Sequence, residues 1–324
     1  MAISRTRLAL LGSAAALTVS TLAPVQLAGA QPAAAAADYD WVALGDSYTA
    51  GVIQAAGDVF EIPRDGCERT DRSYPQVIER DLGSFFELTN ASCGAAMIED
   101  VTSRAQVPIG RSVPGTPDPE SPFAALSAQS EAVNASTDVI TVGVGGNTLG
   151  FGDILFKCLE LGQGSDGAGT PCKDELAASL PGRLAKVARD YDGMLATLHE
   201  KGAKAKILAV GYPTVIPQDT STCQYNHPHQ FLSVTPGDLD WLRTDVLEPL
   251  NKAIEKSAGT QDFASFVDLY DSSEKHSVCD ADKWVEGVLD EDNRTALVHP
   301  NAKGHQDAAD HVTSAILNAV APQD

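Results

Sequence analysis

The pattern that most constrains the fold is a short apolar run that ends in small polar residues. Trp41 to Leu44 is typical of a buried strand, and Gly45-Asp46-Ser47 follows it directly with residue types that favour a turn and a helix start. In open α/β sheets, ligands bind at the carboxyl ends of the strands. Ser47 is therefore well placed for a nucleophile, although a serine that only caps the helix fits these residues equally well.

Similar apolar runs alternate with amphipathic segments along the chain. We expect further strands at 85–89, 138–144, 206–210 and 263–268, and helices at 73–82, 123–133, 174–201, 239–256 and 301–320. Alternating strands and helices indicate a parallel sheet covered by helices on both faces. We therefore predict an α/β fold: a three-layer α/β/α arrangement around a central, mostly five-stranded parallel sheet of the flavodoxin-like kind.

The first 30 residues have the organisation of a secretory signal peptide. Arg5 and Arg7 precede an apolar stretch, Leu8 to Leu22, and Ala28-Gly29-Ala30 fits a small-residue cleavage site. We therefore expect a secreted, extracellular protein. The predicted segments are a signal peptide at 1–30, an alanine-rich linker at 31–38 and a single domain at 39–324.

The charge of the chain limits its partners. It carries 23 basic and 44 acidic residues, which gives a formal net charge of -21. Such a surface repels nucleic acids and anionic membranes, so we expect neither as a partner. No apolar run after the predicted signal peptide approaches the roughly 18 residues of a membrane helix, so we also expect no stable membrane anchor.

Six cysteines follow the predicted signal peptide. An even number in an exported chain favours three disulfides, and six cysteines allow 15 pairings. We favour the sequential pairing, which closes three separate loops, and a monomer. The absence of any C-x-x-C pair argues against a zinc site, so we expect no metal. The expected pairs are Cys67–Cys93, Cys158–Cys172 and Cys223–Cys279.

Three predicted strands end in small or polar residues that lie at one edge of a parallel sheet. These ends are Gly45-Asp46-Ser47, Ser92-Cys93-Gly94 and Gly145-Gly146-Asn147. The backbone amides of Ser47 and Gly94 and the side-chain amide of Asn147 are candidate donors to an oxyanion. If Ser47 is a nucleophile, it also needs a base, which is normally a histidine within hydrogen-bonding reach.

One of the seven histidines is placed to be that base. His299 lies just before the last predicted helix, at another expected edge of the sheet. His227 and His229 form a His-Pro-His loop that is a weak metal signal, and a solvated loop is the favoured interpretation. The remaining histidines in predicted helices are expected at the surface: His199, His305 and His311.

Four blocks in order resemble those of the SGNH (GDSL) hydrolases. They are Gly45-Asp46-Ser47-Tyr48, Gly94, Gly145-Gly146-Asn147 and Val298-His299-Pro300-Asn301. The six cysteines further resemble the secreted bacterial lipase/esterase branch with three disulfides. The resemblance implies ester hydrolysis through an acyl-enzyme without metal or cofactor. It assigns Ser47 as nucleophile, His299 as base, and Ser47, Gly94 and Asn147 as oxyanion donors.

Two positions depart from the family pattern. Thr148 stands where the family often has an aspartate, and Ala296 stands three residues before the histidine, where an aspartate is usual. Our hypothesis is a Ser47–His299 dyad in which the backbone carbonyl of Ala296 orients the imidazole. Asp292 is the alternative orienting group. The other interpretation is that the missing acid marks an inactive enzyme.

These observations favour a secreted serine esterase or lipase that cleaves carboxylic esters, with acylglycerols or other lipid esters as the expected substrates. Two alternatives remain open at this stage. The same site could remove small acyl groups as a carbohydrate or peptidoglycan O-deacetylase. A chain that keeps the fold without turnover would be a secreted binding protein.

Overall fold

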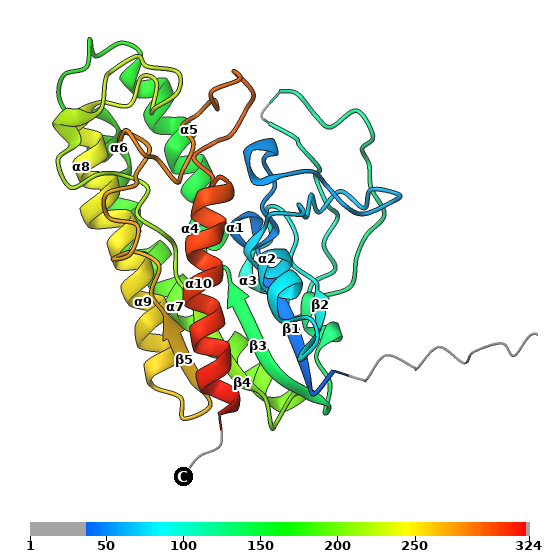
Figure 1. Ribbon diagram of the computed structural model, residues 1–324. Helices are drawn as coiled ribbons and strands as arrows, with labels where there is room; N and C mark the ends of the chain where they lie inside the picture. The colour runs from blue at the N-terminus through cyan, green and yellow to red at the C-terminus, as the bar shows by residue number, and fades with distance from the viewer. Residues whose placement is uncertain (1–36, 114, 322–324) are drawn as a thin grey trace, which may run out of the picture. The chain divides into compact units, whose positions relative to one another are not determined.

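Five parallel strands form the central sheet, in the order β2-β1-β3-β4-β5 (Figure 1). The computed structural model describes residues 37–113 and 115–321, so the predicted signal peptide lies outside the described residues. The strand order is that of the flavodoxin-like folds, and the predicted α/β fold class is confirmed. The strands are β1 (Tyr39–Gly45), β2 (Phe86–Asn90), β3 (Thr137–Gly143), β4 (Lys206–Val210) and β5 (Ala264–Val267).

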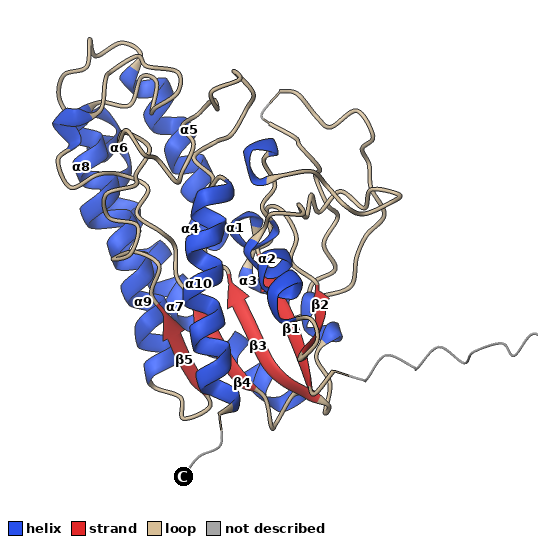
Figure 2. Cartoon of the chain, viewed as in Figure 1, coloured by secondary structure: helices blue, strands red, loops and turns tan. Residues whose placement is uncertain are grey.

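Both faces of the sheet are buried, as the apolar strand sequences require. In β1, Trp41 and Ala43 point into one apolar core, and Val42 and Leu44 point into the other. Helices α2 (Tyr74–Leu82) and α10 (Ala302–Val320) cover the first face, where Figure 2 shows them in front of the strands. The other core contains residues of α3 (Ile98–Thr102), α5 (Phe151–Gly162), α7 (Leu180–Lys201) and α9 (Glu248–Gly259).

The remaining helices are short and lie near the carboxyl ends of the strands or in the connections. They are α1 (Ser47–Ala50), α4 (Gly146–Leu149), α6 (Pro171–Leu176) and α8 (Pro236–Trp241). A π-helical segment, Leu242–Leu247, joins α8 to α9, so the helix predicted over 239–256 contains a wider turn.

Among the segments that differ from the sequence prediction, two have a clear physical cause. The helix expected at 123–133 is wrong, because only a short 3-10 turn forms there, at Gln129–Ala132. Conversely, α5 was not predicted, since its glycine-rich end resembles a loop. Gly162 in this helix packs against the Ser233 carbonyl, where any Cβ would lie 1.8 Å from that oxygen. Tertiary packing therefore decided both segments.

Gln129 explains why the 123–133 segment leaves the helical conformation. Its side chain is buried, accepts the N–H of Gly45 at 2.8 Å and donates to the carbonyl of Gly45 at 2.9 Å. The side-chain amide thus hydrogen-bonds the last residue of β1 as a neighbouring strand would. This contact fixes the backbone directly before the Asp46-Ser47 turn.

Three disulfides link loops to this framework. They join the sequential pairs Cys67–Cys93, Cys158–Cys172 and Cys223–Cys279. The first connects the loop after α1 to the residues that follow β2, and the second joins α5 to α6. The third ties the long segment after β4 to the loop that leads toward α10. Each therefore restrains a connection at the carboxyl edge of the sheet.

Replacement of Gln129 by alanine is expected to destabilise the fold. The variant leaves the buried Gly45 N–H without its acceptor, which costs about 1–3 kcal/mol of unfolding free energy. Urea denaturation followed by circular dichroism measures this change. Gln306→Ala is the control, because its exposed side chain contacts only Asp310, and it should stay within about 0.5 kcal/mol of wild type. Equal stability of Q129A and Q306A would contradict this account of Gln129.

Candidate active site

Ser47 is the first residue of α1, directly after the turn that ends β1. Asp46 caps this helix, and its Oδ1 accepts the N–H of Tyr48 at 3.0 Å. Gly45 has a φ of +150°, and a Cβ there would lie 2.3 Å from Thr49 Oγ1 and 2.5 Å from the Gly143 carbonyl. Only glycine fits this crowded turn. The turn places Ser47 at the carboxyl end of a central strand.

His299 approaches Ser47 from the far end of the chain. Its Nε2 lies 2.7 Å from Ser47 Oγ, and its Nδ1 lies 2.8 Å from the carbonyl oxygen of Ala296. A carbonyl oxygen only accepts, so Nδ1 carries the proton and Nε2 is free to accept the serine hydroxyl. Burial lowers the pKa of His299, although the Ala296 hydrogen bond acts in the opposite direction. The imidazole is therefore neutral at neutral pH, with Nε2 free to accept a proton.

The backbone before His299 adopts an unusual conformation. Leu297 and Val298 both have positive φ angles, +48° and +64°, and a β-branched residue rarely occupies this region. The amides of Ala296 and Leu297 donate to the Val288 carbonyl, and the Val298 amide donates to that of Gly287. These bonds hold a tight turn that directs the Ala296 carbonyl back toward the imidazole. No signal in the sequence marks this turn.

The candidate oxyanion donors reach the same cavity as Ser47. Asn147 donates one hydrogen of its side-chain amide to the Ala96 carbonyl at 3.0 Å, which fixes its orientation and leaves the second hydrogen. Gly94 differs from the simple expectation, because its N–H already donates to the Cys67 carbonyl at 3.0 Å. A Cβ at Gly94 would lie 3.2 Å from Val52 Cγ1, so close packing also favours glycine there.

The two departures from the family pattern have structural explanations. Thr148 Oγ1 accepts the N–H of Ile98 at 2.9 Å, at the first turn of α3. Asp292 points to solvent: its side chain is 72% exposed and pairs with Arg294 at 2.8 Å. The acid considered as an alternative orienting group is therefore engaged elsewhere, whereas the Ala296 carbonyl contacts the imidazole directly.

A cavity of about 590 Å³ opens beside Ser47. This size falls within the range of small-molecule sites, and the lining is mainly apolar. The side chains of α5 and of the π-helix–α9 region form much of one wall, and loop residues line the rest. The apolar lining residues are Val52, Ile53, Ile109, Val113, Phe151, Leu155, Phe156, Val215, Leu247, Leu250 and Leu297.

Comparison with known proteins assigns the chain to a family. The model of the GDSL-like Lipase/Acylhydrolase family matches residues 43–306. The chain belongs to this family. It is accordingly a carboxylic ester hydrolase of the GDSL lipase/esterase kind.

Two curated relatives match most of the chain. "Lipase 2" of Streptomyces coelicolor is 32% identical over 292 residues, which is 88% of each chain. "Esterase" of Streptomyces scabiei is 30% identical over 338 residues and covers 94% of each. The crystal structure of an extracellular lipase from Streptomyces rimosus superposes with a TM-score of 0.60 at 22% identity, covering 86% of this chain and 99% of that one. This likeness supports the fold.

Residues 37–113 and 115–321 contain neither a cluster of metal ligands nor a membrane-spanning helix. No group of three or more His, Cys, Asp or Glu side chains in these ranges is arranged to hold a metal ion. His229 belongs to the His-Pro-His loop that gave a weak metal signal in the sequence. Its Nδ1 lies 2.7 Å from the carbonyl oxygen of Asp290. Within the same ranges, every helix is too short or too polar to cross a bilayer.

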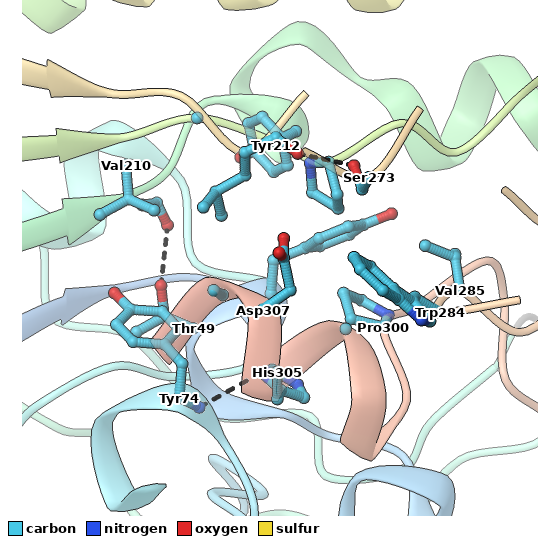
Figure 3. A pocket seen from close by; sticks show the side chains of 17 residues that line it. Thr49, Tyr74, Val210, Tyr212, Ser273, Trp284, Val285, Pro300, His305 and Asp307 are labelled. Carbon is cyan, nitrogen blue, oxygen red and sulfur yellow. Dashed lines mark hydrogen bonds between the residues drawn. The ribbon is translucent and has the colours of Figure 1, made fainter. Parts of the chain in front are cut away.

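A second, much smaller cavity of about 20 Å³ is lined in part by residues of α1, α2 and α10 (Figure 3). His305 of α10 borders it and is only 1% exposed, so its predicted surface position is wrong. Its Nδ1 accepts the N–H of Tyr74 at 3.3 Å, as the dashed line in Figure 3 marks. Burial lowers the pKa of His305 to about 3. The helical spacing does carry this signal, because His305 lies on the same face of α10 as the buried Ala308, Ala309 and Val312.

His305 should make the fold sensitive to acid. The folded-state pKa of about 3 lies below the unfolded value of about 6.5. As pH falls, the unfolded chain therefore binds the proton before the folded protein does. The contribution of neutral His305 to the unfolding free energy is complete above pH 6.5 and is lost as pH falls toward 3. Between pH 7 and pH 5 the residue should remove about 2 kcal/mol of unfolding free energy.

Urea unfolding of wild type and His305→Asn at pH 7 and pH 5 checks this expectation. Asparagine retains an acceptor for the Tyr74 N–H but does not titrate. The loss between the two pH values should be smaller in H305N by about 2 kcal/mol. Parallel losses in the two proteins would mean that His305 does not carry the acid sensitivity.

Proposed function

We propose that this GDSL-family chain is a secreted serine hydrolase that cleaves lipid esters through an acyl-enzyme on Ser47, with His299 as general base. The observation that carries the proposal is the 2.7 Å contact between Ser47 Oγ and His299 Nε2 at the wall of an apolar cavity. Acyl transfer requires a nucleophile within hydrogen-bonding reach of a base, and a third group that orients the base.

The reaction follows from these positions. Ser47 Oγ attacks the ester carbonyl carbon while His299 Nε2 accepts the serine proton. The negative charge that develops on the carbonyl oxygen is stabilised by the Ser47 amide at the start of α1 and the free hydrogen of Asn147. His299 then returns the proton to the leaving alcohol as the C–O bond breaks. Water, activated by the same histidine, cleaves the acyl-enzyme and releases the acid.

Gly94 has a narrower role in this proposal. Its amide already donates to Cys67, so it can contribute to the oxyanion only through a shared hydrogen bond. Gln106 Nε2 donates to the Gly94 carbonyl at 2.8 Å, which fixes the peptide from the other side. We therefore assign the larger part of the oxyanion stabilisation to Ser47 and Asn147.

The Ala296 carbonyl takes the place of the usual carboxylate. It keeps the proton on Nδ1 and orients the ring, which are two of the functions of the third triad member. A carbonyl dipole stabilises the imidazolium less than a full charge does. The left-handed turn at Leu297–Val298 compensates by fixing the carbonyl at 2.8 Å from Nδ1.

The cavity favours a fatty acyl chain as the acid part of the substrate. Its volume of about 590 Å³ and its aromatic and aliphatic walls would be left mostly unfilled by an acetyl group. This supports lipid esters over the O-deacetylase alternative. Export is supported by the signal-like first 30 residues together with three disulfides.

Hydrolysis of p-nitrophenyl esters from acetate to palmitate tests the proposal. We expect kcat/KM to be highest at medium or long chains, because longer chains bury more apolar surface in the cavity. Ser47→Ala should lower kcat by at least about 10³-fold, since it removes the nucleophile. A fluorophosphonate should label wild type at Ser47 and leave S47A unlabelled. Highest activity on acetate would instead support the deacetylase alternative, and absence of labelling would oppose catalysis by Ser47.

Replacement of Asp292 by asparagine separates the two candidates for orienting the base. Because Asp292 pairs with Arg294 in solvent, D292N should keep kcat within about twofold of wild type. Steady-state kinetics on one p-nitrophenyl ester decides the matter. A loss of most of kcat would show that the acid, and not the Ala296 carbonyl, supports His299.

A further inference from the structure

Two tyrosine hydroxyl groups beside the reacting residues, one partly buried and one buried, have no role in the reaction as written. They belong to Tyr48, which follows the nucleophile, and to Tyr212, which follows β4. We propose that Tyr48 and Tyr212 are positioning residues: Tyr48 holds the turn that carries the base, and Tyr212 holds the loop that carries the Asn147 oxyanion donor. This inference rests on the proposed function, in which Ser47 and His299 perform the chemistry.

Tyr48 contacts the histidine turn at its most strained point. Its hydroxyl donates to the carbonyl of Val298 at 2.6 Å, and its ring centroid lies 5.0 Å from that of His299. Val298 has a φ of +64°, so its peptide needs support from its surroundings. The Tyr48 hydroxyl supplies that support on the carbonyl side, while the Gly287 carbonyl accepts the Val298 amide. The side chain next to the nucleophile thus fixes the base.

Tyr212 contacts the oxyanion loop. The amide of Gly146 donates to the Tyr212 hydroxyl oxygen at 2.7 Å, and that oxygen lies 2.6 Å from Asp46 Oδ2. An amide only donates, so the single proton of the hydroxyl is directed to Asp46. Gly146 directly precedes Asn147, and its amide belongs to the peptide that begins α4. Tyr212 therefore fixes the backbone from which the Asn147 side chain projects.

Asp46 links the contacts of Tyr48 to those of Tyr212. Its Oδ2 accepts from Tyr212, and its Oδ1 accepts the backbone N–H of Tyr48. The carboxyl is 1% exposed, and burial raises its pKa to about 7 although both hydrogen bonds favour the charged form. The two tyrosine rings also meet edge to face, with centroids 5.1 Å apart. One continuous network thus links the nucleophile turn, the oxyanion loop and the base.

The contacts also exclude a direct role for either hydroxyl in proton transfer. Tyr48 already donates its proton to the Val298 carbonyl, and Tyr212 directs its proton to Asp46. Burial and the Asp46 charge raise the pKa of both phenols above their ordinary value, so neither ionises in the working range. Their effect on the reaction must therefore pass through the groups that they hold.

The variants Tyr48→Phe and Tyr212→Phe test the proposal. Each removes one hydroxyl and keeps the ring. A fluorophosphonate first counts active sites, and kcat and KM for a p-nitrophenyl ester are then expressed per titrated site. We expect kcat per site to fall about 10- to 100-fold in both variants, because small displacements of catalytic groups have effects of this order. KM should stay within about twofold, since each variant keeps the ring that lines the cavity and each lost hydroxyl donates to a protein group.

Tyr225→Phe is the matched control. The Tyr225 hydroxyl donates to the Gly162 carbonyl at 2.7 Å, so this variant also loses one tyrosine–carbonyl hydrogen bond. We expect kcat per site and KM in Y225F to stay within about twofold of wild type. A trifluoromethyl ketone, which forms a tetrahedral adduct with the serine, should bind Y212F at least about tenfold more weakly than Y225F.

Unchanged kcat per titrated site in Y48F and Y212F would overturn the proposal. A loss of thermal stability alone, or a smaller number of titratable sites with unchanged kcat per site, would overturn it as well. If either variant fails to fold, Asp46→Asn tests the same network. The asparagine side chain has an NH₂ group in place of one of the two carboxylate oxygens that accept hydrogen bonds. Unchanged kcat per site in D46N would also contradict the inference. Failure of wild type to react with the fluorophosphonate at Ser47 would instead reject the proposed function itself.

Discussion

The crowded turn at the end of β1 is the constraint on which the site depends. Gly45 fits between Thr49 and the Gly143 carbonyl only because it has no side chain, and Gln129 saturates its backbone. The chain must therefore leave the sheet at this point and begin a helix at Ser47. β1 pairs with β2 on one side and with β3 on the other, which keeps this turn from moving. Rigid secondary structure thus determines the position of Ser47, the proposed nucleophile, as preorganised catalysis requires.

The proposed base, His299, is positioned by different means. His299 lies on a loop rather than on a strand, and its turn contains two residues with positive φ. Such a turn persists only when neighbouring groups stabilise it. The Gly287 and Val288 carbonyls accept its amides, and the Tyr48 hydroxyl donates to its last carbonyl. The strain is located where the Ala296 carbonyl has to reach the imidazole, so backbone conformation replaces the missing acid.

Most of the fold was predictable because the strands of a parallel sheet are continuous apolar runs. β4 was predicted with its observed bounds, and β1 and β3 within a few residues. The failures have physical causes. Gln129 hydrogen-bonds Gly45, which keeps its segment from forming a helix. Gly162 resembles a loop residue in the sequence, but it ends α5, where it packs against Ser233. His305 was predicted at the surface, although its helical spacing from Ala308, Ala309 and Val312 places it on the buried face of α10.

The sequence by itself determined the α/β class, the order of the blocks and the residues that can carry acyl transfer, because these follow from local hydrophobic pattern and residue chemistry. Only the tertiary structure decided that Ala296 contacts His299 while Asp292 faces solvent, that the Gly94 amide is already engaged, and that Tyr48 and Tyr212 join the blocks. These contacts connect residues up to about 250 positions apart. They depend on backbone direction and on which loops meet, which no local pattern encodes.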